Sequence, residues 1–209
     1  MKILIPFLLL SSFSVNADNY MELGVTDLDS WEGLFSSIDP SKRKRQFIEF
    51  RKELNNDFYL LGSHTKTNSK ISDYSLDEKV STLGVGYKYS LLNYTPYIEL
   101  SAYKYTASSN PLQFGYITLY SEYISPIRDR NGNFYKVGLI KKLDTNTSVD
   151  INYGSYSNVA INDGENNQKS IKLIRKINDH LSLVATYGKD EYVNSIKRDR
   201  RSLSVRFGF

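Results

Sequence analysis

The sequence of 209 residues contains no cysteine and carries 27 basic against 23 acidic side chains, a net charge of +4 at pH 7. The absence of cysteine excludes a disulfide framework and a lipid-modified N-terminal cysteine, and it leaves zinc without its usual ligands. So small a charge gives no support for binding nucleic acid. The chain has 17 Tyr and 10 Phe but one Trp, and such aromatic side chains favour strands and membrane interfaces.

Residues 1–17 have the three parts of a cleavable secretory signal peptide. Lys2 supplies the positive start, Ile3–Leu10 the apolar core, and Val15 and Ala17 the small residues before the cut. The apolar core is too short for a transmembrane anchor, and no later segment reaches the roughly 20 apolar residues of a membrane-spanning helix. We therefore predict a signal peptide at 1–17 and one mature domain at 18–209, exported through the inner membrane.

Beyond the signal the hydrophobic period is two, which indicates strands rather than helices. In Ser81–Leu92, Leu83 and Val85 lie on one face and Gly84 and Gly86 on the other. Segments of about 8–11 residues suit tilted strands that cross a hydrocarbon layer. The expected strands are Tyr20–Val25, Gln46–Glu53, Asp57–Thr67, Ser81–Leu92, Ile98–Tyr103, Phe134–Lys142, Thr147–Gly154, Ser170–Ile177, His180–Gly188 and Arg200–Phe209.

The connections between these strands alternate in length. Tight turns are expected at Leu54–Asp57, Leu92–Pro96, Leu143–Thr147 and Ile177–His180, and long loops at 26–43, 67–79, 106–133, 157–169 and 189–200. Short turns at one end and long loops at the other are typical of a transmembrane barrel with periplasmic turns and extracellular loops. The pattern therefore predicts an all-β fold, an antiparallel up-and-down transmembrane β-barrel.

The strand number is less direct, because Gln113–Tyr123 forms an eleventh strand-like segment. One interpretation is a long extracellular hairpin, since Asn131-Gly132 is a favoured two-residue turn. Another is a twelfth strand hidden in residues 27–38. We prefer ten strands, with twelve as the alternative.

The chain ends on an apolar alternation, Leu203, Val205, Phe207 and Phe209. This ending resembles the terminal strand of Gram-negative outer-membrane barrels, which the barrel-assembly machinery reads as a signal. Together with the signal peptide and the strand pattern, it makes the mature chain resemble small outer-membrane β-barrels of the OmpA/OmpX and Ail type. The resemblance implies the bacterial outer membrane, with both termini in the periplasm.

The two histidines give little support for catalysis. His180 lies beside Asp179 in an expected periplasmic turn, where capping explains it better than the extracellular chemistry of barrel proteases. His64 follows Ser63, but neighbouring residues in a strand point to opposite faces and cannot form a dyad. An enzyme would need His64 to meet a nucleophile or carboxylate from a neighbouring strand. We therefore expect no enzyme, no cofactor and no metal site.

Basic clusters fall in the expected outer loops and strand tops, where lipopolysaccharide presents phosphate. A solvated loop surface explains them equally well. The candidates for lipopolysaccharide contact are Lys42, Arg43, Lys44, Arg45, Arg128, Arg130, Lys197 and Arg198.

Charges of both signs also fall on the faces expected to point inward. We predict an ion-pair network in the lumen formed by Glu49, Arg51, Lys88, Glu99, Lys136 and Arg206, with Glu53 and Lys172 on the same faces. Paired charges are tolerated in a narrow barrel, whereas single buried charges are expensive. The rival interpretation is a narrow, weakly selective pore.

The sequence therefore predicts a monomeric, non-enzymatic outer-membrane barrel with a structural role or a surface-interaction role of its loops. The first alternative is a narrow porin for small solutes or ions, and the second is a barrel hydrolase acting on lipid A or peptides. The expected partners are outer-membrane lipid, lipopolysaccharide and the assembly machinery.

Overall fold

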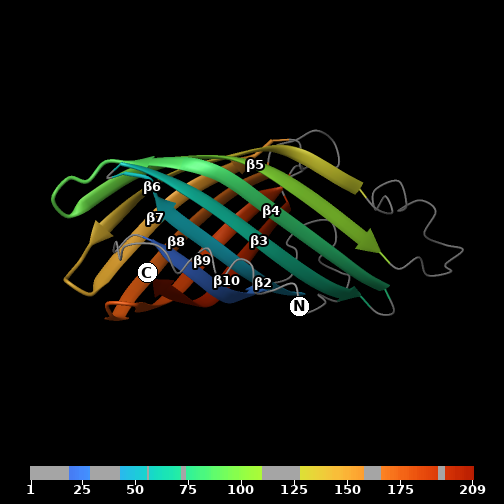
Figure 1. Cartoon of the computed structure of the whole chain (residues 1–209). Coiled ribbons are helices and arrows are strands. Elements are labelled where there is room, and N and C mark those ends of the chain that lie inside the picture. Colours follow the sequence, from blue (N-terminus) through green and yellow to red (C-terminus); the bar gives the residue numbers. More distant parts are fainter. Residues whose placement is uncertain are drawn as a thin grey trace, which may run out of the picture.

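The computed structural model describes residues 19–28, 43–55, 57–71, 74–109, 128–157, 166–192 and 196–209, so the expected signal peptide lies outside the described residues. The described strands form one closed antiparallel barrel of ten strands, which confirms the predicted fold class and strand number (Figure 1). Each strand pairs with its neighbours in sequence, and β1 pairs with β10. The strands are β1 (Tyr20–Leu28), β2 (Arg43–Glu53), β3 (Phe58–Ile71), β4 (Tyr74–Lys88), β5 (Tyr94–Ser109), β6 (Arg128–Lys142), β7 (Thr147–Tyr156), β8 (Asn166–Asn178), β9 (Leu181–Tyr192) and β10 (Ile196–Gly208).

The two ends of the barrel differ in their connections. At the turn end, short links at residues 54–57, 89–93, 143–146 and 179–180 join consecutive strands, and these links lie on the left in Figure 1. The first and last strands also meet there, because Tyr20 is paired with Gly208 and the N–H of Phe209 donates to the carbonyl of Asn19. The opposite end is called the loop end.

The tight turns repeat one hydrogen-bonding device. The Asn55 carboxamide oxygen accepts the N–H groups of Asp57 and Phe58 at 3.0 and 2.7 Å. Asp144 accepts from the N–H of Asn146 at 2.7 Å in the same way. The side-chain oxygen of Asn or Asp can accept the backbone N–H two residues later in the chain, as a backbone carbonyl would, and this hydrogen bond stabilises a tight turn. This device explains why the short links are rich in Asn and Asp.

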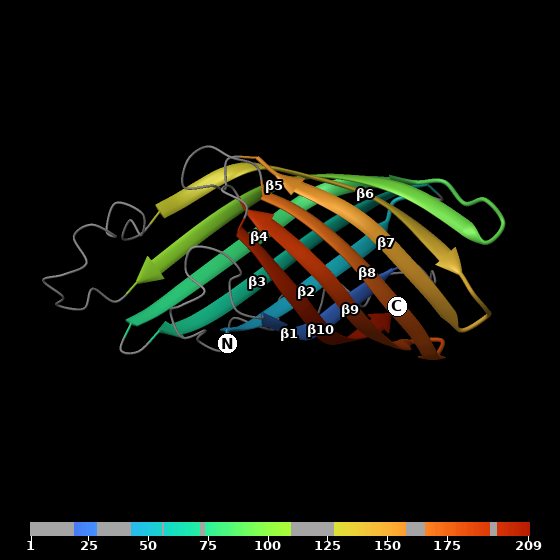
Figure 2. The same ribbon diagram turned by 180° about the vertical axis from the view of Figure 1, so that it is seen from behind.

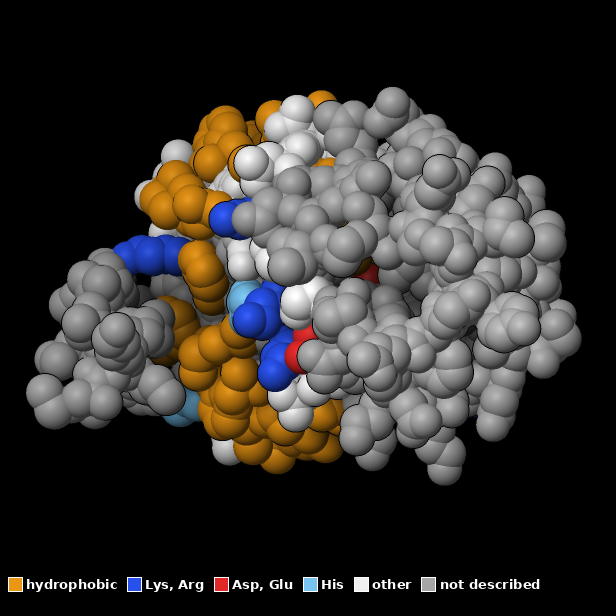
Figure 3. Space-filling view, turned by 90° about the vertical axis from the view of Figure 1, so that its right-hand side faces the viewer, with side chains coloured by type: hydrophobic (Ala, Val, Ile, Leu, Met, Phe, Trp, Pro, Cys, Tyr) orange, Lys and Arg blue, Asp and Glu red, His pale blue; other side chains and the backbone are white. Residues whose placement is uncertain are grey.

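The wall has an apolar outer face and a polar inner face. Outward side chains such as Leu83, Val85 and Leu203 are exposed, whereas their neighbours turn inward and are buried or half-buried. Figure 2 shows the same tilted wall from behind, and Figure 3, which views the loop end, shows hydrophobic side chains along the outside of the wall. The alternation of two along a strand sets both faces. Across the described segments, no helix is long and apolar enough to cross a membrane.

Aromatic side chains border the apolar band of the outer face at its two edges, one toward the turn end and one toward the loop end. Toward the turn end, exposed aromatic residues include Phe58 and Tyr87, whose rings lie 5.0 Å apart. Toward the loop end the hydroxyls of Tyr153 and Tyr187 donate to Asn167 and Asp199 at 2.8 and 3.1 Å. Rings against an apolar band with hydroxyls on polar groups are the arrangement of membrane-interface belts.

Two of the expected long loops are wrong. Residues 67–79 belong almost entirely to β3 and β4, which pair as far as Ile71 and Tyr74, so only 72–73 lie between them. Likewise β9 and β10 pair as far as Tyr192 and Ile196 within the expected loop 189–200. These extensions have polar residues on both faces, as in Lys66-Thr67-Asn68, so no hydrophobic alternation marks them as strands. The ladder hydrogen bonds continue nonetheless.

The expected hairpin turn at Asn131-Gly132 is also wrong. Both residues lie inside β6, where Asn131 pairs with Lys104 and Gly132 with Tyr103. A Cβ on Gly132 would lie 2.6 Å from the Tyr103 ring, so this glycine makes room for an aromatic side chain rather than for a turn. The segment Gln113–Tyr123 and residues 29–38 of the proposed twelfth strand lie outside the described residues.

Glycines opposite aromatic residues recur around the inner wall. Gly86 is paired with Tyr59 and Gly138 with Tyr97, and a Cβ at either glycine would lie within 2.4 Å of the opposing ring. Each ring can therefore lie flat over the neighbouring strand only because its partner has no side chain. These pairs bring tyrosine hydroxyls into the middle of the barrel.

We expect Gly86→Ala to destabilise the barrel by about 1–3 kcal/mol, because the new methyl group displaces the Tyr59 ring. Urea unfolding of the refolded barrel in phospholipid vesicles, followed by circular dichroism, measures the change. Gly208→Ala is the matched control: its added Cβ would meet no atom closer than 3.4 Å, so its effect should stay within about 0.5 kcal/mol. Equal losses in the two variants would contradict the role of the Tyr59–Gly86 contact.

Candidate functional site

The interior of the barrel holds the charged residues that the alternation assigned to the inner face. All six residues of the expected lumen network lie on inward positions: Glu49, Arg51, Lys88, Glu99, Lys136 and Arg206. Glu53 and Lys172 lie on the same faces and pair with Lys88 and Glu49, the latter at 3.8 Å. Glu49 and Arg206 belong to one cluster, and Glu99 and Lys136 to a second cluster. The Arg51 guanidinium lies 3.5 Å from the centre of the Tyr59 ring.

The first cluster is centred on Glu22, a residue that the sequence reasoning did not single out. Glu22 is only 1% exposed, and it accepts two hydrogen bonds from Arg206, at 2.8 and 3.0 Å, and one from Ser204 at 2.6 Å. The Arg206 guanidinium stacks 3.9 Å from the centre of the Tyr20 ring, and the Tyr20 hydroxyl donates to Glu49 at 2.8 Å. Both guanidinium hydrogen bonds go to Glu22 Oε2 and the Ser204 hydroxyl donates to Oε1, so both oxygens of this buried carboxylate have a donor.

The second cluster is centred on Glu99, on β5. Lys136, its partner across the ladder, donates to one carboxylate oxygen at 2.9 Å, and Tyr59 donates to the other at 3.0 Å. One step toward the turn end, the Tyr97 hydroxyl donates to Asp150 at 2.9 Å. Each acid thus accepts from a tyrosine hydroxyl two strands away, since Tyr59 reaches from β3 across β4 and Tyr97 from β5 across β6. These are the tyrosines of the glycine pairs.

A third layer lies toward the loop end. Asp190, 3% exposed, pairs with Arg200 at 3.1 Å. The rings of Phe134 and Tyr156 stack at 4.1 Å, and Tyr103 meets Tyr156 edge-on at 5.3 Å. Aromatic rings and an ion pair therefore line the interior on the loop side of the two acidic clusters.

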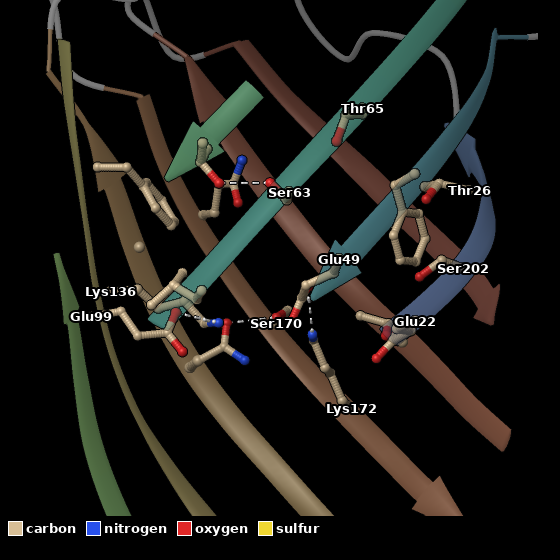
Figure 4. Close-up of a pocket in the computed structure, with 18 of the residues that line it drawn as sticks. Glu22, Thr26, Glu49, Ser63, Thr65, Glu99, Lys136, Ser170, Lys172 and Ser202 are labelled. Carbon is tan, nitrogen blue, oxygen red and sulfur yellow. Dashed lines mark hydrogen bonds and ion pairs between the residues drawn. The ribbon is translucent and has the colours of Figure 1, made fainter. Parts of the chain in front are cut away.

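Between these layers lies a cavity of about 160 Å³ (Figure 4). Glu22, Glu49 and Lys172 point into it from one side and Glu99 and Lys136 from the other, and Ser170 and Ser202 also line it. The space is large enough for a few water molecules. The described lining offers fixed charges that are already paired and no nucleophile beside a base.

Charge pairing of this kind makes each interior residue depend on its partner. Glu22 and Glu49 lie directly opposite each other on β1 and β2, so without cations two carboxylates would face one another. Arg206 and Lys172 supply the positive charge. Removal of one partner from a buried ion pair leaves an uncompensated charge, which is far more costly than loss of the whole pair.

Three interior acids were not predicted from the sequence as members of the lumen network, each for a different reason. Glu22 has the parity of its strand's inner face, so the alternation of Tyr20–Val25 was sufficient to find it. Asp150 was on the polar face of its expected strand, and its role follows only from the Tyr97 hydroxyl. Asp190 fell within an expected loop, so no face could be assigned to it.

The histidines occupy different environments. His180 lies in the tight turn 179–180, and its N–H donates to Asn178 at 2.9 Å. Lys176 donates to the neighbouring Asp179 at 2.7 Å, and this hydrogen bond lowers the pKa of the Asp179 carboxyl. Both residues therefore stabilise the turn.

His64 does meet a hydroxyl of a neighbouring strand. Its Nδ1 lies 2.9 Å from Ser81 Oγ on the exposed outer face of β3 and β4, whereas Ser63 points inward and bonds Thr82 at 2.7 Å. Within the part of the chain that the structure describes, no carboxylate contacts His64. No group of three metal-ligating side chains occurs among the described residues either.

Of the basic residues predicted to contact lipopolysaccharide, the structure describes the side chain of Arg45. Lys42 lies outside the described residues, and for Arg43, Lys44, Arg128, Arg130, Lys197 and Arg198 the described structure extends to the backbone alone. Arg45 corrects the prediction: it lies on the inner face of β2, donates to Thr67 at 3.1 Å and lines the cavity. The alternation that turns Glu49 inward also turns Arg45 inward.

The expected assembly signal lies on the outer face of the last strand. Leu203 and Phe207 are exposed there and Val205 is half-buried, and the three pair with Val25, Met21 and Leu23 of β1. Phe209 follows β10 and is tied to Asn19 by its N–H.

No protein-family profile and no curated protein sequence matches the chain. Solved structures match it in fold. The translocator domain of the autotransporter NalP from Neisseria meningitidis has a TM-score of 0.50 at 8% identity, over 96% of this chain and 91% of that domain. Neisserial surface protein A has a TM-score of 0.45 at 13% identity, over 94% and 100% of the two chains. Ail, the attachment invasion locus protein of Yersinia pestis, has 0.44 at 15% identity, over 92% and 98%.

The chain is similar in fold to small outer-membrane β-barrels. The closed ten-stranded barrel and the match to the NalP translocator domain confirm the resemblance in fold that the strand pattern and the C-terminal residues led us to expect. At these identities the likeness describes the architecture alone.

We expect Arg206→Gln to destabilise the barrel by about 3–5 kcal/mol, because Glu22 and Glu49 then face each other without the guanidinium. The double variant Glu22→Gln/Arg206→Gln should lose less than the single one. Urea unfolding in vesicles measures both. Lys169→Gln, which removes an exposed ion pair of 3.5 Å with Glu191, should cost less than about 1 kcal/mol. A double variant that is less stable than Arg206→Gln would contradict the pairing argument.

Proposed function

We propose that this chain is a non-enzymatic β-barrel of the bacterial outer membrane whose lumen is closed and whose role is structural or carried by its loop end. The apolar outer band between two aromatic levels supports membrane insertion. The fold shared with known outer-membrane barrels supports the same location. The barrel-assembly machinery would recognise the outward apolar residues of β10, and the monomer would be complete because the closed sheet leaves no strand edge.

The observation that carries the closed lumen is the paired interior. Lys172 on β8 pairs with Glu49 on β2 at 3.8 Å, between strands that are not neighbours in the wall. Between adjacent strands, Glu22 pairs with Arg206, Glu99 with Lys136, and Asp190 with Arg200. Stacked rings of Phe134 and Tyr156 fill the space toward the loop end. Charges held by partners and rings held over glycines leave a small cavity rather than a continuous channel, which favours a closed barrel over a narrow porin.

Single-channel conductance of the refolded mature barrel in a planar bilayer tests this proposal. We expect no stable current steps, because moving ions would have to pass the Lys172–Glu49 pair and the stacked rings of Phe134 and Tyr156. Stable, salt-dependent steps would overturn the proposal and establish the porin alternative. Substitution of Lys88, Glu99 or Lys136 by Gln should in that case change the ion selectivity.

A hydrolase remains the second candidate, because His64 lies within hydrogen-bond distance of the Ser81 hydroxyl on the outer face. A base beside a hydroxyl is the minimum for an acyl-transfer nucleophile, but the base is normally oriented by a third group. No carboxylate among the described residues contacts His64, so the pair is better explained as a polar cross-strand contact.

We expect the refolded barrel to release no more fatty acid from lipid A or phospholipid vesicles than its Ser81→Ala variant. Mass spectrometry of the lipid extract measures the release. Turnover that the Ser81→Ala and His64→Ala variants both lose would establish the hydrolase instead.

A further inference from the structure

Two lysines face each other on the outer wall just beyond the apolar band. Lys66 on β3 and Lys79 on β4 are directly paired in the ladder, and both side chains are exposed on the outer face. Side chains opposite each other in an antiparallel ladder have Cβ atoms about 4.5–5.5 Å apart, and like charges there are destabilising. The pair therefore calls for a counter-charge.

A second lysine pair at the same level of the wall shows how such a conflict is ordinarily resolved. Lys169 on β8 and Lys189 on β9 are also directly opposite. Here Glu191 lies 3.5 Å from Lys169 and Asp199 lies 3.8 Å from Lys189, so each ammonium has a carboxylate of this chain. Neither Lys66 nor Lys79 forms an ion pair with any described residue, and Asp77, the next outward residue beyond Lys79, forms none either.

The surroundings of the unmatched pair add donors. In the next row toward the band, His64, Ser81 and Lys104 are paired with one another on β3, β4 and β5 and are exposed. We call the five residues Lys66, Lys79, Lys104, His64 and Ser81 the basic patch. It contains three ammonium groups, a hydroxyl and an imidazole within two rows of one sheet face.

An apolar shelf lies directly below the basic patch. The next row is Gly62, Leu83 and Ala102, and Leu83 is exposed. The Phe50 ring covers Gly62 so closely that a Cβ added there would lie 2.3 Å from it. Leu60, Val85 and Leu100 continue the shelf in the following row and are also exposed. A ligand at the basic patch would thus have cations above and hydrocarbon below.

We propose that the basic patch binds the phosphate of a phosphorylated lipid headgroup, with the acyl chains of that lipid lying on the apolar shelf. The proposal rests on the membrane location proposed above, because the shelf meets acyl chains only in a bilayer. Phosphate supplies the missing counter-charge and accepts from several donors at once. A lipid also explains why the cations stand at the edge of the hydrocarbon band rather than on the loops.

The experiment compares two double variants of the full mature barrel in phosphatidylcholine nanodiscs containing lipid A. Native mass spectrometry measures retention of lipid A across a concentration series, and the same lipid without its phosphates serves as the second probe. Lys66→Gln/Lys79→Gln should weaken binding roughly 30-fold, because each interfacial lysine contributes about a factor of five. Lys169→Gln/Lys189→Gln is the matched control and should change binding less than threefold, since these lysines already have carboxylate partners.

Equal binding of the two double variants, or equal binding of dephosphorylated lipid A, would overturn the proposal. Free inorganic phosphate that displaces lipid A at low millimolar concentration would show an anion site without a lipid requirement, which also overturns it. Circular dichroism of each variant confirms that the barrel is folded. Single-channel conductance tests the closed lumen separately. An open channel that still binds lipid A would contradict the closed lumen alone, and a silent barrel that does not bind lipid A would contradict the lipid site alone.

Discussion

Closure of the sheet is the constraint on which the rest of this structure depends. Pairing of β1 with β10 removes every strand edge, but it encloses the inner face of ten strands in one narrow lumen. Each inward charge must then find a partner inside. The clusters around Glu22 and Glu99 are the result, and the glycines opposite Tyr59 and Tyr97 give the rings the space to reach them.

The same constraint explains which features the sequence could predict. Wherever one face meets hydrocarbon, a period of two is unavoidable, so the faces of Ser81–Leu92 and the inward direction of Glu99 and Lys136 could be inferred from the chain alone. Past the apolar band both faces of a strand are polar, and the alternation disappears although the ladder continues. For that reason β3 and β4 extend to Ile71 and Tyr74 through residues that have the composition of a loop.

Partners were less predictable than faces. Alternation places Glu22 inside but does not identify Arg206, because the two residues are joined only by the register of β1 on β10. The Asn131-Gly132 pair shows the opposite failure: a strong local signal for a turn is overridden by a tyrosine of the adjacent strand. Local preference is a weak guide wherever a cross-strand neighbour occupies the space.

The Glu22–Arg206 contact has a consequence for how the barrel forms. Its residues are 184 positions apart, so this buried ion pair can form only after the whole chain has been synthesised and the other nine ladder pairs are available. A contact of such sequence separation closes late and adds nothing to early folding. It does select the register of closure: a slip of one residue would turn Glu22 toward hydrocarbon, and a slip of two would move it away from the guanidinium. Pairing of the first and last strands in any other register would thus leave the Glu22 carboxylate without its guanidinium, so this contact favours the correct register of closure.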